Sequence, residues 1–206
     1  MSSYTDKIRE TAQRLLKDCS VELVIGFRKG TLPMMNEPCF ARTPQESEQL
    51  VWDSNCGINL ANYLTDRPEK IAIFAKGCDS RNIVTHILEN KIKRDQLHIV
   101  GVPCLGMIDK RLIAADFGDE IIEVSEASDK VVVKGREREK SYKKADVLQE
   151  NCAICIHRNP VLYDELVADE VEEQPDVDRY ADVRRIEAMS PEEKWDYFEK
   201  LMEPCI

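Results

Sequence analysis

The stretch Ile71-Ala-Ile-Phe-Ala-Lys-Gly-Cys-Asp-Ser-Arg81 decides the fold. Its first five residues are an uninterrupted apolar run of strand length, which Lys76-Gly77 ends. Apolar residues then recur at helical spacing from Ile83 to Leu88, and a second apolar run, residues 97–102, ends at Pro103-Cys104. A strand, a helix and a strand of this combined length predict a βαβ unit, in which the two strands are parallel.

Two cysteines, Cys78 and Cys104, directly follow the two predicted strands. Parallel strands place their carboxyl ends at one edge of the sheet, where open α/β sheets bind ligands. Cys78 also begins the predicted helix, where unpaired N–H groups and the helix dipole favour a thiolate. One such cysteine is most often a small buried hydrophobe, but two at adjacent strand ends indicate a site.

Four residues beside these cysteines are candidates for binding a cofactor. Lys76 and Arg81 supply positive charge, and Gly77 and Gly101 leave room for a bulky group to approach the backbone. A flavin is one such group, although the sequence contains no G-x-G-x-x-G run that would indicate a bound dinucleotide.

The strongest single motif is the C-x-x-C pair of Cys152 and Cys155, whose spacing lets one turn of chain present two sulfurs to one metal ion or cluster. A pair is incomplete, because zinc and iron–sulfur clusters normally take four ligands. His157 is either a zinc ligand or a surface histidine. The predicted metal ligands are five cysteines: Cys56, Cys78, Cys104, Cys152 and Cys155.

Composition limits the class of protein. The chain has 206 residues, 43% of them hydrophobic, and a formal net charge of -10. It contains no apolar run long enough for a membrane span and no basic stripe for nucleic acid, so we expect a cytoplasmic protein. Eight cysteines in a reducing compartment indicate metal binding or redox chemistry in place of a disulfide framework.

These patterns predict an α/β domain over residues 1–168, with a mostly parallel sheet and helices on both faces. Two β-rich runs near residues 121–133 predict a small β-hairpin appendage, and the charged residues 135–144 are interpreted as a solvated excursion. Residues 161–167 are interpreted as a short helix.

The remaining residues, 169–206, are predicted to form a C-terminal arm. An acidic linker comes first, and Ser190-Pro-Glu-Glu193 then has the pattern of a helix N-cap. The helix that follows is amphipathic and too short to form a core alone, so we expect it to dock on this domain or on a partner.

The motifs Lys76-Gly-Cys-Asp-Ser-Arg81, Gly101-Val-Pro-Cys104 and the Cys152/Cys155 pair resemble a known family. It is the β-subunit family of deazaflavin-reducing hydrogenases and related formate dehydrogenases, also found with heterodisulfide-reductase-like complexes. The resemblance covers roughly residues 55–160. It implies an iron–sulfur cluster, often a flavin, and other subunits as partners. Members commonly carry a ferredoxin-like segment; no complete one is present here, and Cys205 would be its first cysteine on a longer chain.

Three functional hypotheses follow. The first is an iron–sulfur electron-transfer subunit of an anaerobic oxidoreductase complex, with a 4Fe-4S cluster on the cysteines. The second is an interaction or assembly module stabilised by zinc on the same thiolates. The third is a thiol enzyme with Cys78 as nucleophile and Arg81 holding an anionic substrate, for which the sequence places no general base.

Overall fold

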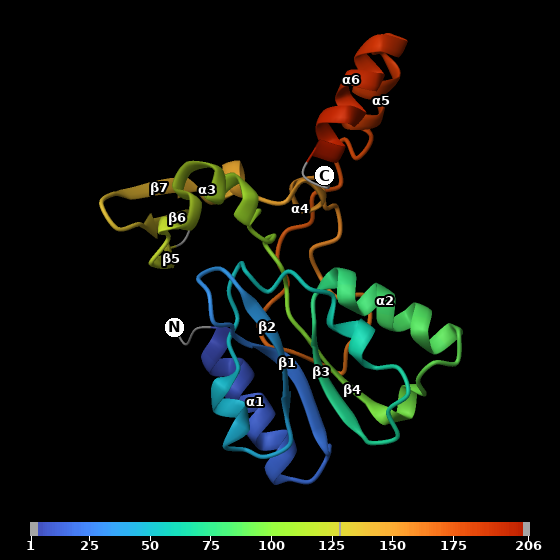
Figure 1. The fold of residues 1–206 in the computed structure, drawn as a ribbon. Helices are drawn as coiled ribbons and strands as arrows, with labels where there is room; N and C mark the ends of the chain where they lie inside the picture. Colours follow the sequence, from blue (N-terminus) through green and yellow to red (C-terminus); the bar gives the residue numbers. More distant parts are fainter. Residues whose placement is uncertain (1–3, 128, 204–206) are drawn as a thin grey trace.

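A five-stranded sheet with the order β2–β1–β3–β4–β8 forms the centre of the protein (Figure 1). It is seen in a computed structural model that describes residues 4–127 and 129–203. Only β2 runs antiparallel to its neighbour; the other neighbouring strands of this sheet are parallel. The strands are β1 (Leu23–Lys29), β2 (Asn36–Ala41), β3 (Ile71–Ala75), β4 (Leu97–Gly101) and β8 (Glu165–Leu166).

The predicted βαβ unit is confirmed. β3 and β4 are adjacent and parallel, with Ile71 opposite Leu97 and Ala75 opposite Gly101. α2 (Gly77–Leu88) connects them and begins at the carboxyl end of β3. The fold is therefore α/β with a mostly parallel sheet, as predicted.

Helices cover the two faces of this sheet. α1 (Tyr4–Lys17) buries Ile8, Ala12 and Leu15 against one face, together with Phe74 of β3. The neighbouring residue Ile73 points the other way and packs in a second core that includes Ile83 of α2. Strands buried on both faces explain why the apolar runs are continuous instead of alternating.

Short 3₁₀ helices occupy several of the connections. They are η1 (Glu46–Gln49), η2 (Leu60–Tyr63), η3 (Arg94–Gln96), η4 (Gly118–Glu120) and η5 (Lys144–Val147).

A second, antiparallel sheet follows β4 and has three strands, β5 (Glu123–Ala127), β6 (Lys130–Lys134) and β7 (Glu139–Lys143). Val131 and Val133 of β6 pack against α3 (Lys110–Phe117) in a separate small core. The predicted hairpin corresponds to β5 and β6. The interpretation of residues 135–144 as a solvated excursion is wrong, because the mostly exposed β7 pairs along the whole of β6.

The interpretation of residues 161–167 as a helix is also wrong, because this segment supplies the edge strand β8. Asp164 accepts a hydrogen bond from the Ile99 N–H (2.7 Å) and pairs with Arg94. Glu165 pairs with Arg14 (2.6 Å) and with His98 (2.7 Å). Tertiary contacts with the open edge of β4 thus override a weak local helical pattern.

These two carboxylates predict that the attachment of β8 weakens in acid. Burial raises the pKa of Asp164 and of Glu165, but hydrogen bonds from Arg94, the Ile99 N–H, His98 and Arg14 outweigh it, so both values lie below the usual range. The stabilisation is therefore present above the unfolded-state pKa and is lost as the pH falls through the lowered folded-state values. Between pH 7 and about pH 3, the free energy of urea unfolding should fall less in Asp164→Asn than in the parent. Equal decreases would show that Asp164 does not contribute to this pH dependence.

The C-terminal arm forms a helical hairpin of α5 (Ala181–Glu187) and α6 (Pro191–Met202), which projects away from the central sheet (Figure 1). The predicted N-cap is present: Ser190 accepts from the Glu193 N–H, and Glu193 accepts from the Ser190 N–H. The apolar side chains of α6 remain exposed, Trp195 at 66% and Leu201 at 57%. Within the described residues, we find no helix with the length and apolar character needed to cross a membrane.

Candidate functional site

Four of the five candidate cysteines line one small cavity at the carboxyl edge of the central sheet. Cys78 lies in the first turn of α2, Cys104 follows β4, and Cys152 and Cys155 lie in and just after α4 (Glu150–Ala153). The cavity has a volume of about 30 Å³. Lys76, Gly77, Gly106, His157 and Arg158 complete its lining.

Backbone contacts bring the C-x-x-C turn to Cys104. The segment after Cys104 forms an isolated β-bridge with the segment before α4, between Ile108 and Leu148. The Gln149 N–H donates to the Met107 carbonyl (2.8 Å), and the Cys152 N–H donates to the Gln149 carbonyl (2.8 Å). The spacing of two residues and this pairing together place both sulfurs beside the end of β4.

Gly106 makes the close approach possible. Its φ of +102° is one that side-chain-bearing residues rarely adopt. A Cβ at this position would lie 2.8 Å from a Leu148 methyl group and 3.5 Å from Cys152 Cβ. The Gly106 N–H in turn donates to Cys104 Sγ at 3.4 Å. In the sequence this position is only a glycine two residues after a cysteine, a pattern too common to predict the close approach.

The two glycines predicted to admit a cofactor have the chain itself packed on them. A Cβ at Gly77 would lie 2.7 Å from the His157 carbonyl oxygen and 2.9 Å from that of Asn159. At Gly101 it would lie 2.6 Å from a Leu166 methyl group and 3.0 Å from Pro160. The missing side chains therefore let the segment after the C-x-x-C turn pack on α2 and β4.

We expect Gly77→Ala to destabilise the protein by about 1–3 kcal/mol, the usual cost of overpacking. The added methyl group would push against two backbone carbonyls that cannot rotate away. Gly57→Ala is the matched control, because its Cβ would meet only the flexible Gln149 side chain, at 3.2 Å. Urea unfolding of both variants tests this; equal free energies of unfolding would show that the segment yields freely.

A polar clamp holds the same segment from its other side. The carboxylate of Glu173 accepts from the Arg158 N–H (2.6 Å) and the Asn159 N–H (3.1 Å). The buried Asn159 side chain donates to the Val171 carbonyl (2.7 Å) and accepts from the Val171 N–H (2.9 Å). On the inner side, the Cys104 N–H donates to the Arg158 carbonyl (3.0 Å). The clamp thus fixes one wall of the cysteine cavity.

The pKa values of the thiols differ from the sequence expectation. Burial raises the pKa of Cys78 and of Cys152, and it raises the pKa of Cys104 to about 11. The positive charge of Lys76 lowers these pKa values by less than burial raises them. At Cys78 desolvation therefore acts against the thiolate that a helix N-terminus favours. A cation or cluster among these thiols would favour their deprotonation.

Cys56, the fifth candidate, lies in the hydrophobic core and does not line the cavity. Cys56 lies in an irregular segment before η2. Its Sγ accepts from the Asn36 side chain (3.3 Å), and burial raises its pKa to about 12. These are the surroundings of a structural thiol.

Arg81 does not line the cavity either, unlike Lys76 and Gly77. Cys205, the expected first cysteine of a ferredoxin-like run, lies outside the described residues.

Within residues 4–127 and 129–203, no three side chains of the ligating types converge closely enough to hold a single metal ion. The four thiols surround a space without meeting at a point. A multinuclear cluster takes one thiolate per iron and so spreads its ligands more widely than one ion does. The four cysteines match the ligand set of a cluster, whereas the volume of the cavity, about 30 Å³, is small.

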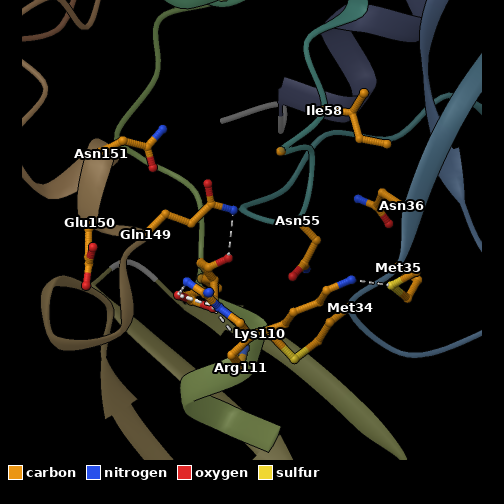
Figure 2. A pocket seen from close by; sticks show the side chains of 13 residues that line it. Met34, Met35, Asn36, Asn55, Ile58, Lys110, Arg111, Gln149, Glu150 and Asn151 are labelled. Carbon is orange, nitrogen blue, oxygen red and sulfur yellow. Dashed lines mark hydrogen bonds and ion pairs between the residues drawn. The ribbon is translucent and has the colours of Figure 1, made fainter. Parts of the chain in front are cut away.

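A larger cavity of about 460 Å³ lies between the start of β2, the segment of Asn55 and the segment that begins α3 (Figure 2). Amide side chains of Asn36 and Gln149 and the cations Lys110 and Arg111 line it. It adjoins the C-x-x-C turn, because Glu150 also lines it. This cavity could not be predicted from the sequence, because its lining comes from four separated segments.

Comparison with known proteins gives a structural likeness to a hydrogenase complex. No protein-family model and no curated protein matches the sequence. A chain of the xenon-derivatised F420-reducing NiFe hydrogenase complex from Methanosarcina barkeri has a similar structure, with a TM-score of 0.58 and 13% sequence identity. The match covers 75% of this chain and 62% of that chain, so the present chain spans less than two thirds of its length. At this identity the likeness concerns the fold.

Proposed function

We propose that this chain is an iron–sulfur electron-transfer subunit of a multi-subunit oxidoreductase of the hydrogenase, formate dehydrogenase or heterodisulfide-reductase-like type. One observation carries the proposal: Cys78, Cys104, Cys152 and Cys155, from three separate segments, line one cavity. Four cysteines are the usual ligand set of a 4Fe-4S cluster. The structural similarity to a chain of a hydrogenase complex supports a place in such a complex.

In this proposal the four thiolates would hold the cluster, and the cluster supplies one-electron transfer. The remaining residues shape its surroundings. Lys76 places a positive charge beside the thiols, and the clamp of Asn159 and Glu173 keeps the wall behind them in place. The partial exposure of the cysteines leaves a short path for electrons to a partner at this edge of the sheet.

The C-terminal hairpin supports the subunit part of the proposal. α6 exposes Trp195, Phe198 and Leu201 along one stripe. Apolar surface of this kind on a helix is typical of a protein–protein contact. Charged side chains of both signs, among them Asp196, Glu199 and Lys200, border the stripe, which favours a partner surface with an apolar groove and a polar rim.

A flavin, the second cofactor that the resemblance implies, is proposed for the larger cavity. Its volume of about 460 Å³ lies within the range of small-molecule sites. Lys110 and Arg111 would face the phosphate, although Arg111 already pairs with Asp109 at 2.7 Å. The protein is purified with added flavin, passed through gel filtration and then denatured. Release of a fluorescent flavin on denaturation would support flavin binding, and loss of the flavin during gel filtration would contradict it.

The deciding experiment is anaerobic purification of the chain followed by iron, sulfide and zinc analysis. We expect a brown protein with broad visible absorbance and about four irons and four sulfides per chain. A colourless protein with stoichiometric zinc would instead establish the assembly-module alternative. The thiol-enzyme alternative has less support, because burial raises the pKa of Cys78 and so disfavours the nucleophilic form.

A further inference from the structure

Lys76 is a charged side chain in the interior of the protein. It is 2% exposed, and its partner Asp79 is fully buried. Desolvation of an ammonium group is costly unless charges and dipoles replace the lost water. Lys76 Nζ lies 2.8 Å from Asp79 Oδ2 and donates to the Ile58 carbonyl at 3.1 Å. The desolvation cost of this buried lysine indicates a role other than keeping the surface soluble.

Two aromatic rings complete the surroundings of the ammonium group. Nζ lies 5.0 Å from the centre of the Phe27 ring and 5.7 Å from that of Trp52. The two rings pack edge to face on each other, with centres 5.9 Å apart. Cation–π attraction and this packing fix the position of the charge, so that it cannot reach solvent by extending outward.

The fixed charge faces the cysteines. Lys76 lines the same cavity as Cys78, Cys104, Cys152 and Cys155. Its partner Asp79 does not line this cavity. The positive member of the ion pair therefore lies on the side of the thiols.

We propose that Lys76 is a positioning residue that raises the reduction potential of the iron–sulfur cluster held by these four cysteines, an inference that rests on the proposed function. Reduction adds one electron from a one-electron donor to the cluster. No bond forms or breaks, and Lys76 keeps its proton. A fixed positive charge in a poorly solvated site stabilises the more negative, reduced form.

The test is a redox titration of the reconstituted protein, followed by the visible absorbance of the cluster. Lys76→Met removes the cation, and we expect the ratio of reduced to oxidised cluster at the parent's midpoint to fall about tenfold, which is about 59 mV for a one-electron couple. Lys91→Met is the control; Lys91 lies beyond the other end of α2, is exposed and pairs with Glu89 at the surface. Its charge is screened by water, so its midpoint should equal the parent's.

A second variant protects the test against misfolding. Lys76→Met leaves Asp79 buried without its partner, whereas Lys76→Met/Asp79→Asn removes both charges. We expect a smaller shift in the same direction, because Lys76 lines the cysteine cavity and Asp79 does not. Equal midpoints in the parent and the double variant, both with a full cluster, would overturn the role of Lys76. A parent without iron and sulfide would overturn the proposed function itself.

Discussion

Cys152→Ser should lose its iron and sulfide almost completely, whereas Cys19→Ser should keep both at the parent level. Cys152 is one of four cysteines that line the small cavity, and a hydroxyl is a poor replacement for a thiolate on iron. Cys19 is exposed, follows α1 and does not line the cavity. The two variants thus make the same chemical change inside and outside the proposed site.

The same substitution should destabilise the protein only when the cluster is present. Binding to the folded state adds stability to the parent, and Cys152→Ser forfeits that contribution. Thermal unfolding of anaerobic samples should therefore show a clearly lower midpoint for Cys152→Ser than for Cys19→Ser, with the difference vanishing after chelation. Equal iron, sulfide and zinc contents in the parent and both variants would remove the main support for the electron-transfer proposal.

The central fold could be predicted because its signals are local and strong. The run Ile71–Ala75 and the helical spacing after Gly77 each identify one element, and the handedness of βαβ units then fixes their arrangement. The edge strand β8 could not be predicted, because long-range contacts place it. It pairs with the open edge of β4, Glu165 contacts Arg14 and His98, and Asp164 just before the strand pairs with Arg94. β7 was missed for a similar reason: its side chains are mostly solvent-facing, so no apolar period marks it.

The cysteine site divides in the same way. Strand ends and the C-x-x-C spacing are visible in sequence, and the structure brings Cys78, Cys104, Cys152 and Cys155 to one cavity. Nothing in the sequence separates them from Cys56, whose burial in the core depends on long-range packing. The burial of Lys76 is equally invisible, because a lysine after a strand is usually at the surface. Its enclosure depends on Phe27 and Trp52, which come from distant segments.

Asn159→Ala should destabilise the metal-free chain by about 1–3 kcal/mol, because it leaves partly buried backbone groups of Val171 without partners. The Asn159 side chain bonds both the N–H and the carbonyl of Val171, at 2.9 and 2.7 Å, and donates to Glu173 at 3.0 Å. Alanine makes none of these bonds and is too small to fill the space.

Asn62→Ala is the matched control, since Asn62 is exposed and its side-chain contact is a bond from Asn82 at 3.2 Å. Its cost should stay within about 0.5 kcal/mol, as for most surface substitutions. Urea unfolding of the two metal-free variants measures the difference. Since Asn159 also fixes the segment that carries His157 and Arg158, the Asn159→Ala protein should further lose iron faster in air than Asn62→Ala. If Asn159→Ala were as stable as Asn62→Ala, residues 171–173 would not hold the wall of the cysteine cavity. The rate of cluster loss would then depend on other contacts.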